Sequence, residues 1–252
     1  IAFGCAQALR EAGADLAVTY LNAKARPYTE PLSAALGAEL FLPCDVREEG
    51  QVEALFAALA ERWGKLDFLL HSIAFAPRED LHGRVTDCSR EGFDMAMNVS
   101  CHSFIRMARH AEPLMKDGGA LMTMSYYGAE KVVPHYNVMG PAKAALESSV
   151  QYLAMDLGPD NIRVNAISAG PVRTLAGAGI SDARYMFSYQ QRNAPLRRTV
   201  VIDEIGGSAL YLLSDLSSGV TGEIHSVDSG YNTVSMPTME ELKQLSAATG
   251  DD

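Results

Sequence analysis

The run GALMTMS at residues 119–125, with LDFLLHS at 66–72 and IRVNAI at 162–167, decides the fold class. Each run is nearly continuous in apolar residues, whereas a strand with one face in water alternates apolar and polar positions. A strand of this kind is buried on both faces, which requires helices on either side of a parallel sheet. These runs therefore predict interior strands of a parallel α/β sheet.

Helices and strands alternate along the chain outward from these runs. The patterns predict helices at 1–12, 31–36, 49–63, 90–115, 143–157 and 203–213, and further strands at 15–20, 39–44 and 223–227. No linker-like stretch, shift of composition or internal repeat divides the sequence. We therefore expect a Rossmann-like, doubly wound α/β fold in which residues 1–252 form a single dinucleotide-binding and catalytic domain.

The composition excludes several classes of protein. The chain has 252 residues, 48% hydrophobic and 21% charged, which excludes an intrinsically disordered protein. A net charge of −10 argues against non-specific binding to nucleic acid or to an anionic membrane, because both need clustered Lys and Arg. The four cysteines form no C-x-x-C pair, so we expect no metal site and a reducing compartment. Without a signal peptide or a bilayer-spanning apolar run, the sequence predicts a cytoplasmic protein.

One expected motif does not occur at the start of the chain. A dinucleotide-binding sheet begins with a strand and a Gly-rich turn that holds the pyrophosphate at a helix N-terminus. This sequence has no G-x-G-x-x-G, and its first residues already follow the pattern of the helix after such a turn. We expect that the first strand and the Gly-rich turn are missing from this chain. The alternative is a fold that binds no dinucleotide.

Tyr136 and Lys143 are the first candidates for chemistry. Seven residues are about two helical turns, so the spacing predicts that both side chains share one helix face. A nearby ammonium lowers the pKa of a phenol or strengthens it as a hydrogen-bond donor, which suits acid catalysis near neutral pH. The structural alternative is a tyrosine that closes the core beside a lysine that reaches to solvent. Tyr127 and Lys131 are a rival pair, but the flanking glycine and proline argue against a continuous helix there.

Four stretches resemble the enoyl-acyl-carrier-protein reductases of bacterial fatty-acid synthesis, which belong to the short-chain dehydrogenase/reductase superfamily. They are HSIAFAP at 71–77, SYYGAE at 125–130, YNVMGPAK at 136–143 and RVNAISAGPVRTLA at 163–176. The most specific feature is the spacing, because this family keeps Tyr and Lys seven apart with a second Tyr ten residues upstream. Tyr126, Tyr136 and Lys143 fit that spacing, and the resemblance extends from residue 1 to about residue 235.

The resemblance implies an activity and three catalytic residues. The activity is reduction of the trans-2 double bond of enoyl-acyl-carrier-protein by hydride from NADH. Tyr136 would donate a hydrogen bond to the thioester oxygen as negative charge develops there. Lys143 would hold the nicotinamide ribose hydroxyls, and Tyr126 would lie beside the acyl chain.

The resemblance also implies the residues that bind cofactor and substrate. For the cofactor they are Ile1, Leu21, Asp45, Val46, Ser72, Ile73, Ala74, Ser125, Lys143, Val172, Arg173, Thr174, Leu175 and Ala176, with Asp45 accepting from the adenine amine. For the substrate they are Ala76, Leu81, Tyr126, Met139, Ile180 and Met186, with residues 177–193 as the substrate-binding loop. Ala74 departs from the Gly of many relatives, which puts the shape of the nicotinamide region in doubt.

Several alternatives stay open at this point. Another short-chain reductase, such as a 3-oxoacyl-carrier-protein reductase, is the main one, although those enzymes have Ser where this chain has Thr123. A relative that binds nucleotide without turnover is the second. Residues 21–24 carry no clear determinant of NADH or NADPH, so NADH is taken from the family and NADPH stays open. Arg173, Arg184 and Arg197 would meet an acidic acyl carrier protein, and the family implies a homotetramer.

Overall fold

Parallel strands carry the loops on which the candidate residues lie. The computed structural model describes residues 1–172 and 183–249, and every strand pair in that part of the chain is parallel. One sheet pairs β1 (Ala17–Tyr20) with β2 (Leu40–Pro43). The other has the order β3 (Phe68–His71), β4 (Gly119–Ser125), β5 (Ile162–Ala169) and β6 (Ile224–Val227). The predicted parallel α/β fold is confirmed.

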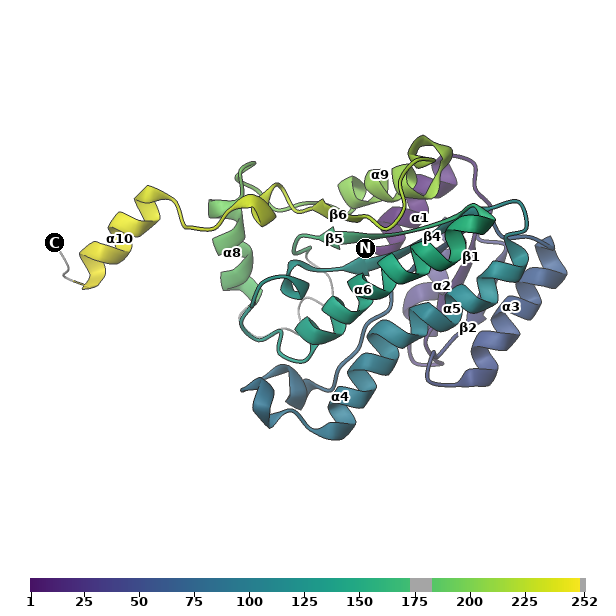
Figure 1. Cartoon of the computed structure of the whole chain (residues 1–252), viewed down its shortest axis with the longest axis horizontal. Coiled ribbons are helices and arrows are strands. Elements are labelled where there is room, and N and C mark those ends of the chain that lie inside the picture. The colour runs from purple at the N-terminus through teal and green to yellow at the C-terminus, as the bar shows by residue number, and fades with distance from the viewer. Residues whose placement is uncertain (173–182, 250–252) are drawn as a thin grey trace.

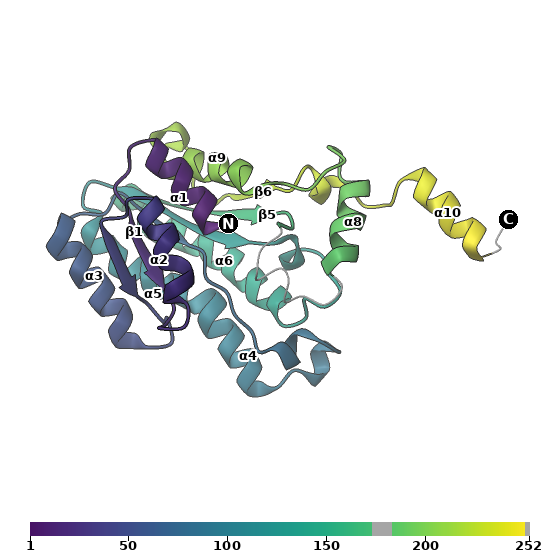
Figure 2. The ribbon, with the colours of Figure 1, turned by 180° about the vertical axis from the view of Figure 1, so that it is seen from behind.

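Helices cover both faces of the strands, as Figures 1 and 2 show from opposite sides. On one face lie α1 (Ala2–Glu11) and α9 (Ile202–Leu213), and on the other α3 (Glu49–Trp63), α5 (Ser103–Ala111) and α6 (Met139–Leu157). The remaining helices are α2 (Arg26–Ala35), α4 (Arg90–Met97), α8 (Ala183–Asn193) and α10 (Met239–Thr249). Figure 1 shows α10 projecting away from the body of the molecule beyond α8.

Strand β4 illustrates how burial on both faces follows from its sequence. Leu121 packs into the apolar cluster of α3, α5 and α6, whereas Met122 and Met124 pack into the cluster of α1 and α9. Because successive side chains of a strand point to opposite faces, Thr123 and Ser125 face α5 and α6 with Leu121. The two hydroxyls at the carboxyl end of β4 therefore point toward the face covered by α5 and α6, and α6 carries Lys143.

The two sheets part between β1 and β3. A cavity of about 910 Å³ lies at this break and is lined by β1 residues such as Val18 and β3 residues such as Leu69. Ala2 and Phe3, at the start of α1, also line it. Within residues 1–172 and 183–249, no strand lies between β1 and β3. The expectation of an earlier strand and Gly-rich turn stays a prediction.

The long helix predicted at 90–115 is interrupted. After α4, residues Asn98–His102 form a π-helical turn, and α5 then runs only to Ala111. A π turn takes up an extra residue within a helix and rotates the faces on either side of it. Pro113 cannot donate the helical hydrogen bond, which explains the short 3₁₀ turn Glu112–Leu114 where the prediction continued the α-helix.

The prediction also placed the first residues of two helices too late. Helix α2 begins at Arg26 rather than at residue 31, with Pro27 in its first turn, where a missing N–H costs nothing. The Asn22 side chain accepts from the N–H groups of Lys24 and Ala25 and so initiates the turn that leads into it. Helix α6 begins at Met139 rather than at Lys143.

Within the described residues, no helix has both the length and the apolar character that a membrane crossing needs.

Candidate functional site

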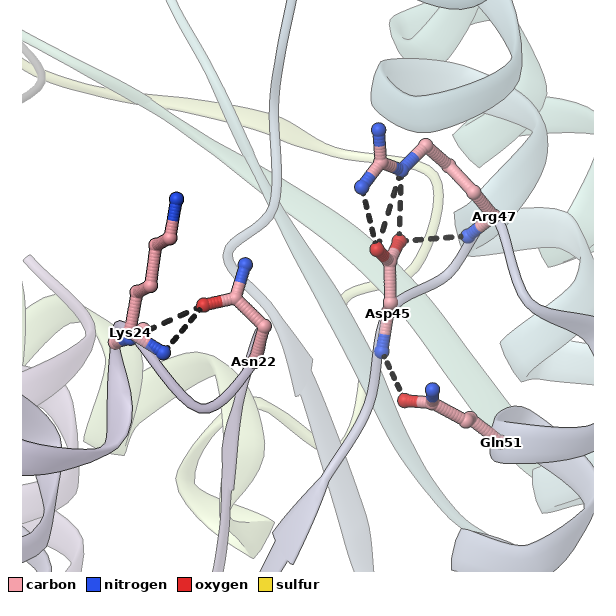
Figure 3. Close-up of polar contacts among 6 residues, drawn as sticks. Asn22, Lys24, Asp45, Arg47 and Gln51 are labelled. Carbon is pink, nitrogen blue, oxygen red and sulfur yellow. Dashed lines mark hydrogen bonds and ion pairs between the residues drawn. The ribbon is translucent and has the colours of Figure 1, made fainter.

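The loop after β2 holds Asp45 in a network of hydrogen bonds (Figure 3). Its carboxylate accepts from Arg47 Nε at 2.9 Å, from Arg47 Nη2 at 2.5 Å and from the Arg47 backbone N–H at 3.0 Å. The N–H of Asp45 donates to Gln51 at 2.8 Å, which ties the loop to the start of α3. The hydrogen bonds from Arg47 hold the pKa of Asp45 below its ordinary value. Asp45 is therefore a fixed, ionised acceptor at the sheet edge.

A recess of about 440 Å³ lies between the loops that follow β1 and β2. Asn22 and Asp45 face it from neighbouring loops, as Figure 3 shows. Arg26 also lines it and forms an ion pair with Glu30 at 2.9 Å. A recess with an ionised acceptor on one wall and a guanidinium on another suits the adenosine end of a nucleotide.

The larger cavity gathers six of the ten predicted cofactor residues that lie in the described part of the chain. It is lined by Leu21, Asp45, Val46, Ser72, Ile73 and Ala74, which follow β1, β2 and β3. The carboxyl ends of parallel strands are where such sheets bind dinucleotides, and small side chains allow the close approach that a cofactor needs. The residues at the strand ends therefore fit a dinucleotide, whereas much of the remaining lining consists of apolar side chains from α1, α3, β1 and β3.

The remaining cofactor residues lie at the margins of this region or outside the described part of the chain. Ile1 precedes α1 and Val172 follows β5, and both pack against the cluster of α1 and α9. Ser125 is the last residue of β4. Arg173, Thr174, Leu175 and Ala176 lie outside the described residues, as do Ile180 of the substrate set and residues 177–182 of the loop.

Tyr126 and Tyr136 lie against each other at the end of β4. Their ring centroids are 4.9 Å apart and the rings are inclined at 69°, an edge-to-face contact. Burial raises the pKa of Tyr126 to about 12, and burial also raises the pKa of Tyr136, with smaller contributions from Tyr126 and Glu147. Both phenols are therefore protonated hydrogen-bond donors at neutral pH.

One geometric expectation about Tyr136 was wrong. Tyr136 does not share a helix face with Lys143, because it lies in the turn before α6 and the next residue, Asn137, has a φ of 35°. A positive φ departs from helical backbone, so the sequence spacing alone could not place the two side chains. Of the two effects expected of the ammonium, a lowered pKa is not found: burial raises the pKa of Tyr136, and Tyr126 and Glu147 add to the rise. The other expectation, a stronger hydrogen-bond donor, stays a prediction.

Lys143 is buried in the second turn of α6, and its side chain is 5% exposed. Its Nζ donates to the carbonyl oxygen of Met124 at 2.6 Å, so the lysine reaches the end of β4 rather than solvent. Burial lowers the pKa of Lys143 to about 8, an effect that the Cys101 thiol and the Glu147 carboxyl oppose. Tyr127 and Lys131, the rival pair, follow in a 3₁₀ turn and a bend rather than in a helix.

A separate apolar cluster lies beside the tyrosine pair. The structure packs the predicted substrate residues Ala76, Leu81 and Met139 together, and Tyr136 contacts the same cluster. Met186, another predicted substrate residue, lies half-buried on α8, outside this cluster. The cluster is apolar, as an acyl-binding region must be, and it borders Tyr136 of the tyrosine pair.

Two groups in the site were missed by the sequence analysis. His71 is fully buried between Thr123 Oγ1 and Ser103 Oγ, each at 2.8 Å from a ring nitrogen, and burial lowers its pKa to about 3. Glu147 accepts a hydrogen bond from Ser125 Oγ. A carboxyl four residues after Lys143 on a predicted helix was a signal that could have identified Glu147.

Comparisons with known proteins agree with this geometry. The family model described as enoyl-(acyl carrier protein) reductase matches residues 1–232. The chain is 56% identical over 247 residues to enoyl-[acyl-carrier-protein] reductase [NADH] 2 of Rhizobium meliloti, covering 98% of this chain and 92% of that protein. It is 47% identical over 241 residues to the FabI enzyme of Escherichia coli, covering 95% and 92% of the two chains.

Solved structures show the same fold. The enoyl-acyl-carrier-protein reductase of Anaplasma phagocytophilum, solved with NAD, has a TM-score of 0.90 and 53% identity, covering 94% of this chain and 90% of that one. FabI of Candidatus Liberibacter asiaticus has a TM-score of 0.92 and 51% identity, covering 94% and 92%. The sequence match, the fold and the arrangement of the two tyrosines and the lysine show that the chain belongs to the enoyl-acyl-carrier-protein reductase family.

Proposed function

We propose that this chain reduces the trans-2 double bond of enoyl thioesters on acyl carrier protein, with NADH as the reductant. Its membership of the family and the match to NADH-dependent relatives support this activity. The proposal is carried by the contact between Tyr126 and Tyr136, whose ring centroids are 4.9 Å apart. Tyr136 also packs against the apolar cluster, and Lys143 contacts the same end of β4. This arrangement joins two proton donors to an apolar surface for the acyl chain.

In the reaction, bound NADH would supply a hydride to the β-carbon of the enoyl group, and the α-carbon of the resulting enolate would take a proton from solvent. Tyr136 donates a hydrogen bond to the thioester oxygen, where negative charge develops only as the double bond is reduced. Its raised pKa keeps the proton on the phenol at neutral pH, so that Tyr136 acts as a donor rather than as a phenolate. Tyr126, in edge contact with it, limits the orientation of the Tyr136 ring and borders the acyl chain.

Lys143 has a positioning and a binding role in this proposal. An ammonium has three N–H donors, and the Met124 carbonyl accepts one of them. The others are available to the nicotinamide ribose hydroxyls. At the far end of the cavity, Asp45 would accept from the adenine amine, and Val46 would supply an apolar edge.

Thr123 argues against the alternative of a 3-oxoacyl-carrier-protein reductase. It stands where those enzymes carry a serine, and it is fully buried, with its Oγ1 at 2.8 Å from a ring nitrogen of His71. A hydroxyl engaged in the core is not placed to contact a substrate carbonyl. The family match also favours the enoyl reductase.

We expect the Tyr136→Phe variant to lower turnover of crotonyl thioester with NADH by about 10-fold or more, through loss of one donor to the developing oxyanion. Crotonyl and acetoacetyl thioesters are to be compared in parallel assays of NADH oxidation. Unchanged turnover of crotonyl thioester would remove Tyr136 from the mechanism. Oxidation of NADH with acetoacetyl thioester alone would contradict the proposed activity.

The proposal extends to partners and location. Arg173, Arg184 and Arg197 would receive the acidic carrier protein beside the substrate-binding loop 177–193, and NADPH is the alternative cofactor. A homotetramer would cover the exposed Ile105 on α5 and Tyr152 and Met155 on α6. The four unpaired cysteines are in keeping with a reducing cytoplasm.

A further inference from the structure

Neighbouring residues at the end of β4 are tied to consecutive turns of α6. Lys143 Nζ donates to the backbone carbonyl of Met124 at 2.6 Å, and Ser125 Oγ donates to the carboxylate of Glu147. Lys143 and Glu147 are four residues apart on α6 and so lie on the same face, one turn from each other. We call these two contacts the β4–α6 clamp. The residue after Ser125 is Tyr126, so the clamp also fixes where the tyrosine segment begins.

The clamp places a carboxyl near a buried ammonium, where it adds to the larger effect of the Cys101 thiol. Burying a charge is costly unless an opposite charge or several hydrogen bonds offset the lost hydration. The groups that face Lys143 are His71 from β3, the Cys101 thiol from the π-helical turn and Glu147 from α6 itself. His71 is neutral at neutral pH because burial lowers its pKa to about 3. Of these three groups, Glu147 is the one that carries a carboxyl.

Several neighbouring groups influence the pKa of Glu147. It is half-buried, and burial and the nearby Glu130 raise its pKa, whereas the hydrogen bond from Ser125 and the charge of Lys143 lower it. Glu147 also contributes to the raised pKa of Tyr136. Its carboxyl therefore stands within electrostatic range of both proposed catalytic groups, yet its hydrogen bond runs to Ser125.

We propose that Glu147 is a positioning residue of the enzyme. Through the Ser125 hydroxyl it holds the end of β4 against α6, and through its charge it favours the ammonium form of the buried Lys143 side chain. It acts through Ser125 and Lys143, and neither substrate nor cofactor needs to touch it. This inference rests on the proposed role of Lys143 in holding the nicotinamide ribose.

The test compares Glu147→Gln with the unmodified enzyme and with Asp160→Asn, a carboxyl-to-amide change at an exposed residue just beyond the end of α6. In Glu147→Gln the new amide oxygen can still accept from Ser125, but the charge is gone. Because Glu147 raises the pKa of Lys143, its removal shifts the alkaline limb of kcat/KM to lower pH by about half a unit. In the same variant, the dissociation constant of NAD⁺ rises more at pH 9 than at pH 7, because binding weakens more at the higher pH. Asp160→Asn leaves both profiles unchanged.

A second pair of variants separates geometry from charge. Glu147→Ala removes the charge and the acceptor, and we expect kcat/KM at pH 7 to fall about 10-fold below that of Glu147→Gln, in line with a lost buried hydrogen bond. Ser125→Ala breaks the hydrogen bond but keeps the charge, so its alkaline limb stays in place while kcat/KM falls.

Superimposable pH profiles of the Glu147→Gln variant and the unmodified enzyme would overturn the inference. The outcome of Lys143→Met separates this failure from failure of the proposed function. Loss of turnover in Lys143→Met with an unshifted Glu147→Gln profile refutes the role of Glu147 alone. Full turnover in Lys143→Met refutes the proposed role of Lys143 and the inference with it.

Discussion

The carboxyl end of β4 and the carboxyl ends of β1 and β2 carry the two groups of candidate residues in different surroundings. Six of the seven residues of β4 are buried, and Lys143 behind them is 5% exposed. The residues of β1 are all half-buried, and the ion pairs at its edge include Arg47, whose side chain is 48% exposed. The chemical end of the site is thus held by internal contacts, whereas the nucleotide end relies on groups that water reaches.

This difference predicts unequal sensitivity to substitution. A buried group has a fixed position and no water to replace a lost partner, so its removal is costly. An exposed ion pair is screened by solvent and contributes little. Substitutions at the β4 end should therefore alter turnover strongly, and substitutions at the β1–β2 end should alter cofactor binding moderately and stability hardly at all.

Lys143→Met should have the largest effect. It removes the donors proposed for the ribose and the contact to Met124, so we expect kcat/KM for NADH to fall about 100-fold. Steady-state kinetics and a circular dichroism spectrum check turnover and folding together. A folded variant with turnover near that of the unmodified enzyme would break the contrast between the two ends.

His71 should make the β4 end sensitive to acid. Its pKa in the folded protein is about 3, below the ordinary 6.5, so the unfolded chain binds more protons between these values and stability falls as pH decreases. From pH 6.5 to 5 this amounts to about 1.5 kcal/mol of unfolding free energy. Urea unfolding at both pH values measures it. The His71→Gln variant, which has no titrating ring, should lose less stability over this range, and equal losses would contradict the assignment.

Asp45→Asn should act on cofactor binding alone. The amide keeps an oxygen acceptor but not the charge, so we expect the KM for NADH to rise about fivefold, with kcat unchanged. Binding of the nucleotide fragment ADP to this variant should weaken by the same factor in a direct binding titration. A fall in kcat without a change in KM would place Asp45 at the chemical end.

Arg47→Ala should have the smallest effect on stability. Its guanidinium pairs with Asp45 while half-exposed, so we expect the Tm to shift by about 2 °C or less, and by less still at high salt. Thermal unfolding at two ionic strengths checks this. A larger loss would mean that the β1–β2 end is held as firmly as the end of β4.

Some elements could be predicted to the residue and others could not. Helix α3 at Glu49–Trp63 and strand β4 at Gly119–Ser125 have the predicted bounds, because each is a clear apolar pattern with a Gly at one end. The prediction of one continuous helix at 90–115 was wrong, because a π turn leaves no signature in the spacing of apolar residues. The family motifs identified Tyr126, Tyr136 and Lys143, and the structure places the two tyrosines in contact and brings Lys143 to the same end of β4.

The sequence by itself determined the parallel α/β fold, the order of its elements and the family, because apolar runs and motif spacing are local properties. Only the tertiary structure decided that Tyr136 lies in a turn before α6, that its phenol stays protonated and that Ser125 bonds to Glu147. Burial sets the pKa of a phenol and packing chooses the partner of a hydroxyl. Both depend on residues that meet only when the chain has folded.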